Sequence, residues 1–334
     1  MAPNPSPGFY LTRTGGLGDV LMALAAAKAL KLATGAPVRL VTAPAYRDLA
    51  RACPHLDQVL TTAGEAQAAL EDVRRSAAAG RVRNLDAAAF GSAPRHQVDA
   101  YLDAFGFSAP AEHKDVQLEL PEPVRARAAA RVAGLPPLGR GRRILLHPAT
   151  GDPNRTWPLA HWDALAEALL AAGHQVVRVG QSRTGDGRGI HALTDPRVLQ
   201  AVDLPGALDF IALCRSADLL VSTDSGPIQL AAATDLAIVG LYTVVPGRNR
   251  LPFRHGVPAW RATAVEASCA CFPCYQYLND PVIMAPFLAA FREGTLTAPR
   301  LFAEWCVVED PFVCLREEIL PDRVLRACLE RIQD

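Results

Sequence analysis

The sequence predicts an α/β protein with two doubly wound parallel sheets, and three observations support this fold class. Short apolar runs of strand length alternate with longer segments of helical periodicity along both halves of the chain. Glycine-containing turns connect a strand to a helix at two places, residues 15–19 and 224–226. The chain has 334 residues, of which 50% are hydrophobic, so it is long enough for two domains with sizeable cores.

In the first half, apolar runs predict strands and periodic apolar positions predict helices. The expected strands are 9–12, 38–42, 58–60, 82–85 and 118–120, and the expected helices are 20–32, 46–52, 65–79, 96–105 and 121–132. Proline and glycine interrupt both patterns at residues 135–141, which we interpret as a linker. The predicted domains are therefore residues 1–138 and 139–334.

The second half repeats the alternation. The expected strands are 144–147, 175–179, 198–201, 219–221 and 237–242, and the expected helices are 160–172, 208–216, 283–292 and 321–332. Pro158 and Pro321 lie close to the starts of two of these helices, where proline is favoured. Because strands joined by helices run parallel and are covered on both faces, we expect two Rossmann-like domains that face a cleft.

The stretch 219–235 reads as strand, tight turn and helix. Asp224, Ser225 and Gly226 supply turn and N-cap chemistry, and Pro227 suits the first turn of a helix. A helix that starts where a strand ends points unpaired N–H groups and its positive dipole end at one spot. The pattern predicts an anion site that fits a diphosphate. The alternative is an ordinary capped turn without a ligand.

A similar turn follows the first strand. Gly15, Gly16 and Gly18 allow the backbone to approach a ligand closely, and Asp19 falls in the first turn of the helix, where the dipole favours a carboxylate. The alternative is that Asp19 caps the helix. The full Gly-x-Gly-x-x-Gly spacing of a dinucleotide site is absent, which argues against NAD.

Charge and hydropathy argue against several classes of protein. The chain has 34 Lys and Arg against 34 Asp and Glu, so its charge gives no indication of nucleic-acid binding. We see no signal peptide and no uninterrupted apolar run of about 18 residues, so a soluble cytoplasmic protein is expected.

Five of the eight cysteines lie between Cys269 and Cys314. Cys271-Phe-Pro-Cys274 has the spacing of a metal knuckle, and four thiolates from Cys271, Cys274, Cys306 and Cys314 would suit a structural zinc or iron ion. The insert between them is longer than such spacings usually are. Reduced buried thiols or a redox pair are therefore equally good interpretations of this cysteine-rich region, residues 269–314.

Three stretches together resemble glycosyltransferase family 9, the heptosyltransferases of lipopolysaccharide synthesis. They are residues 16–21 (Gly-Leu-Gly-Asp-Val-Leu), residues 155–158 (Arg-Thr-Trp-Pro) and residues 224–227 (Asp-Ser-Gly-Pro) with the alanine-rich helix that follows. Residues 204–218 also resemble the family segment before the central strand. The resemblance implies the GT-B fold, an acceptor-binding N-terminal domain, a nucleotide-sugar-binding C-terminal domain and no catalytic metal.

The resemblance also implies residue roles. Asp19 would be the general base of an inverting transfer, and Gly15, Gly16 and Gly18 would form the acceptor-side loop. The nucleotide-sugar donor would bind at Thr150, Arg155, Asp224, Ser225, Gly226 and Gln229. The family commonly has lysine where this chain has Arg155 and histidine where it has Gln229. Arginine keeps the positive charge, whereas glutamine only hydrogen-bonds.

The expected donor is therefore ADP-heptose or a related nucleotide diphospho-sugar, and the expected acceptor is a glycan, lipid-linked or protein molecule. Contact with the periphery of the inner membrane is compatible with such acceptors. One protein-modifying subgroup of the family binds iron through comparable cysteines.

Two other functions stay open. A non-catalytic sugar-nucleotide-binding protein would keep the anion site but would have no reason to keep Asp19. A sugar-nucleotide epimerase on the same fold would need further acidic residues and no acceptor. Turnover measured with and without an acceptor separates these alternatives.

Overall fold

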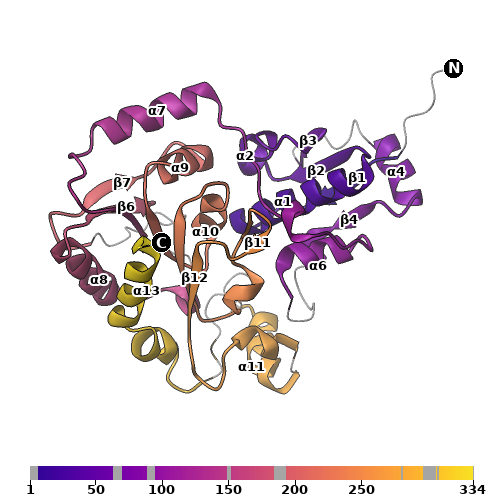
Figure 1. Ribbon diagram of the computed structural model, residues 1–334. Coiled ribbons are helices and arrows are strands. Elements are labelled where there is room, and N and C mark those ends of the chain that lie inside the picture. Colours follow the sequence, from indigo (N-terminus) through magenta and orange to yellow (C-terminus); the bar gives the residue numbers. More distant parts are fainter. Residues whose placement is uncertain are drawn as a thin grey trace. The chain divides into compact units, whose positions relative to one another are not determined.

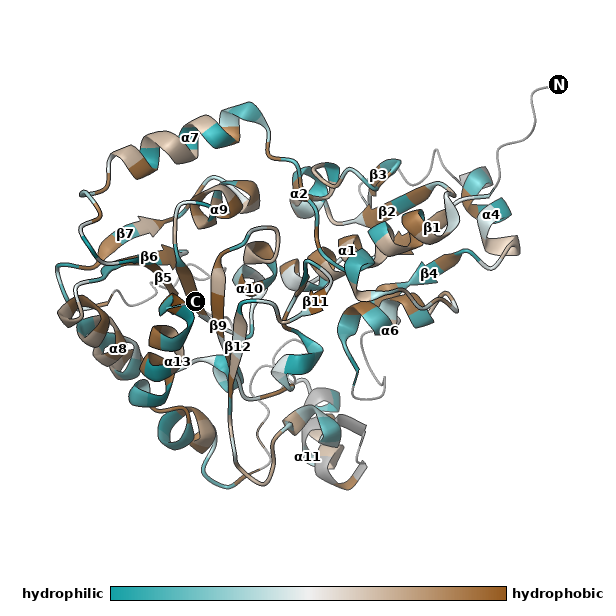
Figure 2. Ribbon diagram, viewed as in Figure 1, coloured by the Kyte–Doolittle hydropathy of each residue, from teal (hydrophilic) through white to brown (hydrophobic). Residues whose placement is uncertain are grey.

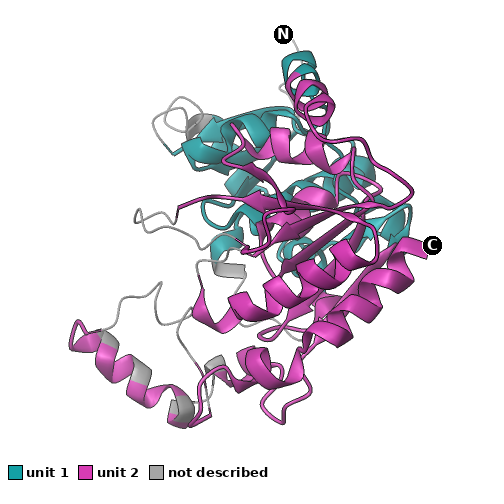
Figure 3. Ribbon diagram, turned by 90° about the vertical axis from the view of Figure 1, so that its left-hand side faces the viewer, with its two compact units in different colours: residues 1–126, 252–260 teal, residues 127–251, 261–334 magenta. Residues whose placement is uncertain are grey.

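The computed structural model of the protein describes residues 7–62, 70–88, 95–148, 152–183, 193–279, 281–295, 306 and 308–333. The chain forms two compact units (Figure 3). The first comprises Met1–Ala126 and Pro252–Trp260, and the second comprises Arg127–Leu251 and Arg261–Asp334. Each unit contains its own parallel sheet, which confirms the predicted α/β class with two parallel sheets.

The division between the units falls inside helix α7 (Glu122–Ala133), ahead of the linker at which the sequence placed it. Arg127 of this helix donates through Nε to Asp209 Oδ1 at 2.7 Å and through Nη2 to Asp209 Oδ2 at 3.0 Å. Such a two-bond pair has favourable geometry, and both of its residues belong to the second unit. The ligand-binding roles expected of the two domains stay predictions.

The first unit contains a four-stranded sheet of order β3-β2-β1-β4 (Figure 1). Its strands are β1 (Phe9–Thr12), β2 (Val38–Thr42), β3 (Gln58–Thr61) and β4 (Val82–Asn84). Its helices are α1 (Leu17–Thr34), η1 (Pro44–Tyr46), α2 (Arg47–Arg51), α4 (Leu70–Ala78), α5 (Leu85–Ala88), α6 (Gln97–Asp103) and η2 (Ala111–His113), and the short pair β10 (Phe253–Arg254) and β11 (Val257–Pro258) also belongs to this unit.

Helix α1 is the most deeply buried helix segment of this unit, because residues 20–30 have almost no exposed surface. Alanine and leucine dominate it, which favours a helix and lets it pack closely. Lys28 is the polar residue of this buried segment, and its charge is compensated by Asp115 at 2.5 Å. Gly35 ends the helix with φ 63° and donates to the Lys31 carbonyl.

The second unit contains a six-stranded parallel sheet of order β12-β9-β8-β5-β6-β7. Its strands are β5 (Arg143–His147), β6 (Gln175–Gly180), β7 (Leu199–Val202), β8 (Leu219–Thr223), β9 (Ala237–Tyr242) and β12 (Ala262–Glu266). Its helices after α7 are η3 (Pro153–Arg155), α8 (Leu159–Ala171), α9 (Ala207–Cys214), α10 (Gly226–Ala231), η4 (Gly247–Asn249), η5 (Cys274–Asn279), α11 (Pro281–Arg292), the π-helix η6 (Cys314–Glu318) and α13 (Pro321–Gln333).

The central strands β5, β8 and β9 of this sheet are buried along their whole length and mostly apolar, as Figure 2 shows by their brown colour, because parallel strands are covered on both faces. One face packs against α8 and α13 in a core that includes Trp157, Trp162 and Val324. Trp157 also donates from Nε1 to the Ile319 carbonyl at 2.6 Å. This bond fixes the chain just before the terminal helix.

Some element predictions were wrong or incomplete. Residues 118–120 form no strand and join no sheet, and the Glu119 N–H donates to the Ala52 carbonyl. Helix α5, the β10–β11 pair and β12 were not predicted from the sequence. Part of the helix expected at 65–79 and part of the insert after η5 lie outside the described residues, as does Thr150.

None of the described helices is long and apolar enough to cross a membrane.

Replacing Gly240 by alanine is expected to destabilise the second unit. A Cβ atom at this position in β9 would lie 2.6 Å from the Tyr242 ring and 3.0 Å from Ile228 Cδ1, so the core would have to move. Overpacking of this kind costs about 1–3 kcal/mol of unfolding free energy. Urea denaturation measures the change. Gly139→Ala is the control, since a Cβ there meets nothing within 4 Å, and equal stability of the two variants would contradict the packing argument.

Candidate functional site

The turn between β1 and α1 holds Asp19 close to a buried arginine. Gly16 adopts φ 72°, a conformation that favours glycine, and the helix starts at Leu17. The Asp19 Oδ2 atom lies 2.8 Å from Nη2 of Arg13. A Cβ atom on Gly16 would lie 2.4 Å from the same Oδ2, so the glycine permits this close approach. The Asp19 side chain is about a quarter exposed, which leaves it accessible to a ligand.

Two residues beside Asp19 were not found from the sequence. Arg13 contacts Asp86 as well as Asp19, with 3.1 Å between Nη1 and Asp86 Oδ1. Asp86 accepts hydrogen bonds from the N–H of Thr14 and from its hydroxyl at 2.8 Å. The sequence did contain an indication that these two residues are neighbours, because Arg13 follows β1 and Asp86 follows β4. Neighbouring parallel strands bring their carboxyl ends to the same edge.

The second predicted site lies where β8 ends. Ser225 is the N-cap residue of α10 and has an extended backbone, and its hydroxyl donates to the Thr223 carbonyl at 3.0 Å. Arg155 lies beside this turn, because its Nη1 donates to the Asp224 carbonyl at 2.7 Å. The guanidinium also pairs with Asp152. The structure therefore brings Arg155, Asp224 and Ser225 together, although 69 residues separate the first two.

A buried polar chain continues from Ser225 into the sheet. The Ser225 and Ser222 hydroxyls are 3.0 Å apart, and Ser222 Oγ is 3.3 Å from Nδ1 of His147 on the neighbouring strand β5. Burial lowers the pKa of His147 to about 4, so its ring is neutral near pH 7. This partner could not be predicted from the sequence, because periodicity shows His147 only as the end of a strand.

Gln229 has a partner within the protein. It is buried in α10, and its side-chain amide donates to the Arg250 carbonyl in the loop after β9. This bond couples the helix of the second turn to that loop. A role of Gln229 toward a ligand stays a prediction.

The cysteines of the region 269–314 include thiols that lie close enough to influence one another. Cys269 Sγ and Cys271 Sγ are 3.4 Å apart. Burial raises the pKa of Cys274, and Cys271, Cys314 and Cys306 raise it further. All the described cysteines are free thiols. Among the described residues, no three His, Cys, Asp or Glu side chains are arranged to hold a metal ion.

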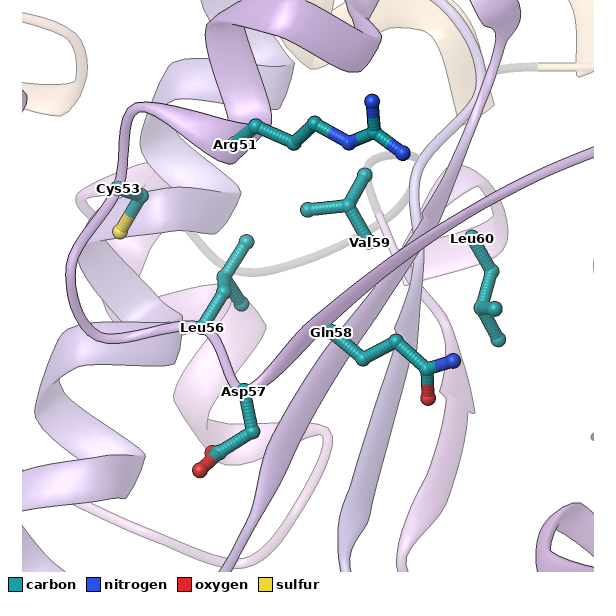
Figure 4. Close-up of a pocket in the computed structure, with 7 residues that line it drawn as sticks. All are labelled: Arg51, Cys53, Leu56, Asp57, Gln58, Val59 and Leu60. Atoms are coloured by element: carbon teal, nitrogen blue, oxygen red, sulfur yellow. The ribbon is translucent and has the colours of Figure 1, made fainter.

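A separate pocket of about 530 Å³ lies beside the edge strand β3 (Figure 4). The lining residues come from α2, the following loop and β3, and they are Arg51, Cys53, Leu56, Asp57, Gln58, Val59 and Leu60. None of the residues that the sequence predicted for a site lines this pocket. It therefore adds no support to the predicted chemistry.

The chain resembles a known protein family in sequence. Residues 59–276, more than half of the chain, match the model of glycosyltransferase family 9 (heptosyltransferase). No sequence among curated proteins matches the chain.

Solved structures share the fold at low sequence identity. A family 9 glycosyltransferase from Veillonella parvula is 16% identical with a TM-score of 0.64, over 98% of both chains. The E. coli ADP-heptose lipopolysaccharide heptosyltransferase II is 14% identical with a TM-score of 0.59, also over 98% of both chains. The iron-containing dodecameric heptosyltransferase TibC of enterotoxigenic E. coli, in complex with ADP-D-β-D-heptose, is 15% identical with a TM-score of 0.64, over 98% of this chain and 76% of TibC.

These likenesses show a GT-B-like α/β fold with two parallel sheets. The family model covers the turn at Asp224 and the loop at Arg155. The chain belongs to glycosyltransferase family 9, the heptosyltransferase family, and is a glycosyltransferase.

Proposed function

We propose that the protein is an inverting glycosyltransferase that moves a heptose from ADP-heptose, or a related nucleotide diphospho-sugar, to a glycan, lipid-linked or protein acceptor. The Asp19 carboxylate, held beside the glycine turn and open to solvent, is the observation that carries this proposal. The donor is supported by relatives, since TibC was solved with ADP-D-β-D-heptose and another relative is an ADP-heptose lipopolysaccharide heptosyltransferase. We place the reaction in the cytoplasm, at the periphery of the inner membrane, where lipid-linked acceptors would be reached.

Asp19 acts as the general base in this proposal. It takes the proton from an acceptor hydroxyl while the hydroxyl oxygen forms a bond to the anomeric carbon of the donor sugar. The bond from that carbon to the diphosphate oxygen breaks on the opposite face, so the configuration inverts and the nucleoside diphosphate leaves. A positioned base typically contributes about 10²- to 10⁴-fold to the rate.

The turn after β8 stabilises the departing diphosphate. Arg155, fixed by the Asp224 carbonyl, supplies a guanidinium that can bind phosphate oxygens bidentately. The backbone N–H groups at Ser225 and Gly226 add hydrogen-bond donors, and Thr150 completes the set in our proposal. Positive charge and oriented donors are what a leaving diphosphate requires, because negative charge grows on it as the bond breaks.

We also propose that Cys271, Cys274, Cys306 and Cys314 hold a structural zinc or iron ion. Four thiolates suit either metal, although in the described structure these four side chains are not arranged as a metal site. TibC, which shares the fold, contains iron. The ion would connect η5 with the segment before α13 and would take no part in sugar transfer.

Asp19→Asn is expected to lower turnover by about 10²- to 10⁴-fold, because asparagine cannot accept the proton. Release of ADP from ADP-heptose in the presence of an acceptor measures this loss. Asp48→Asn is the matched control, since Asp48 is an exposed carboxylate in the first turn of α2. Turnover at the wild-type level in Asp19→Asn would remove Asp19 from the role of base.

Arg155→Ala is expected to weaken the binding of ADP by about tenfold or more, since hydrogen bonds to charged groups contribute about 1.5–3 kcal/mol. Calorimetry with ADP-, GDP-, UDP- and dTDP-sugars identifies the nucleotide. Arg197→Ala is the control, because Arg197 pairs with Asp195 on the surface. Equal ADP affinity in both variants would contradict the proposed phosphate contact, and a preference for another nucleotide would replace ADP in the proposal.

Cys271→Ser is expected to release the metal ion and to lower the melting temperature by about 5 °C or more, because metal binding to the folded state stabilises it. Elemental analysis of the purified protein gives the metal content, and thermal unfolding gives the shift. Cys314→Ser should have the same effect if both thiolates bind one ion. Purified wild-type protein without stoichiometric zinc or iron would rule out the metal.

A further inference from the structure

We propose that Arg13 and Asp86 form a charge-balancing pair that positions Asp19 and favours its uptake of a proton. This inference rests on the proposed role of Asp19 as general base. Arg13 and Asp86 are positioning residues in it, since they act through Asp19 and not on the substrate directly.

The guanidinium of Arg13 is buried between two carboxylates. Nη2 contacts Asp19 Oδ2 at 2.8 Å, and Nη1 contacts Asp86 Oδ1 at 3.1 Å. Only 8% of the Arg13 side chain is exposed, against 26% for Asp19 and 31% for Asp86. The cation therefore lies beneath the two carboxylates, and the carboxylates are the accessible part of the cluster.

Asp86 is the fixed end of this cluster. Thr14 donates to it from its backbone N–H, at 3.1 and 3.2 Å to the two carboxylate oxygens, and from its hydroxyl at 2.8 Å. Nη1 of Arg13 also reaches the Leu85 carbonyl at 3.4 Å. The side chain of Arg13 is thus oriented from the β4–α5 junction, and it transmits this orientation to Asp19 across the edge of the sheet.

The charges of the cluster explain why two carboxylates are useful. One guanidinium and two carboxylates carry one net negative charge before the reaction, and proton uptake by Asp19 brings the cluster to zero. Without Asp86, the same step would begin at zero and leave an uncompensated guanidinium in a largely buried position. An unpaired buried charge is costly, so Asp86 lowers the cost of protonating Asp19.

Substitutions at the two positions separate charge balance from simple support. Asp86→Asn keeps the shape of the side chain but leaves Arg13 paired with Asp19 alone, and kcat is expected to fall by about tenfold or more with little change in KM. Arg13→Gln is expected to lower kcat through loss of orientation. The double variant carries both Arg13→Gln and Asp86→Asn, so it lacks the guanidinium that Asp86→Asn alone leaves uncompensated. Its kcat is therefore expected to exceed that of Asp86→Asn. Asp86→Glu keeps the charge and should retain more turnover than Asp86→Asn.

The experiment measures kcat and KM of these variants with ADP-heptose and an acceptor, beside Asp19→Asn. Unchanged melting temperature and ADP affinity verify that each variant is folded. A double variant whose kcat equals the product of the single effects, or an Asp86→Asn protein with wild-type kcat, would overturn the inference while the proposed function stands. Full turnover in Asp19→Asn would instead overturn the base assignment and, with it, the role of the pair.

Discussion

Parallel strand pairing is the constraint on which the rest of this structure depends. In a parallel sheet all carboxyl ends lie at one edge, and each strand must be followed by a crossover segment, usually a helix. The turns after β1 and β8 therefore emerge beside the turns of neighbouring strands. Arg13 meets Asp86 from β4–α5, and Asp224 meets Arg155 from the loop after β5. Residues far apart in the chain become neighbours because the sheets order them this way.

The sheets also determine which polar groups must be paired inside the protein. The central strands of the second sheet are buried on both faces, so a polar side chain at a strand end there gains from a partner within the protein. His147 and Ser222 satisfy each other beneath the turn at Ser225, and Arg13 lies between two carboxylates. In each unit a polar side chain beneath the exposed turn, Ser222 or Arg13, is held by other protein groups. A turn supported in this way keeps its geometry when a ligand binds.

The C-terminal part of the second unit leaves the sheet and then packs back onto it. The cysteine-rich region leaves the sheet after β12, and the chain returns to it through α13, which packs on the same core as α8. The bond from Trp157 to the Ile319 carbonyl joins this return to the loop that carries Arg155. The stability of the terminal helix and the position of that loop are therefore linked through one buried tryptophan.

The sequence by itself determined the α/β class, most strands and helices, both glycine turns and the family, because periodicity and short motifs are local properties of the chain. It failed at 118–120, where an apolar run resembled a strand but joins no sheet. It also failed at β12, an edge strand whose short polar and apolar residues give little periodic signal. Only the tertiary structure decided that Arg13 and Asp86 accompany Asp19, that His147 supports Ser225, and that the Gln229 amide binds a loop carbonyl. Strand order and register bring Arg13 to Asp86 and His147 to Ser222, and both arise from packing the whole sheet. The sequence shows that Arg13 and Asp86 follow strands, but not that these strands are neighbours.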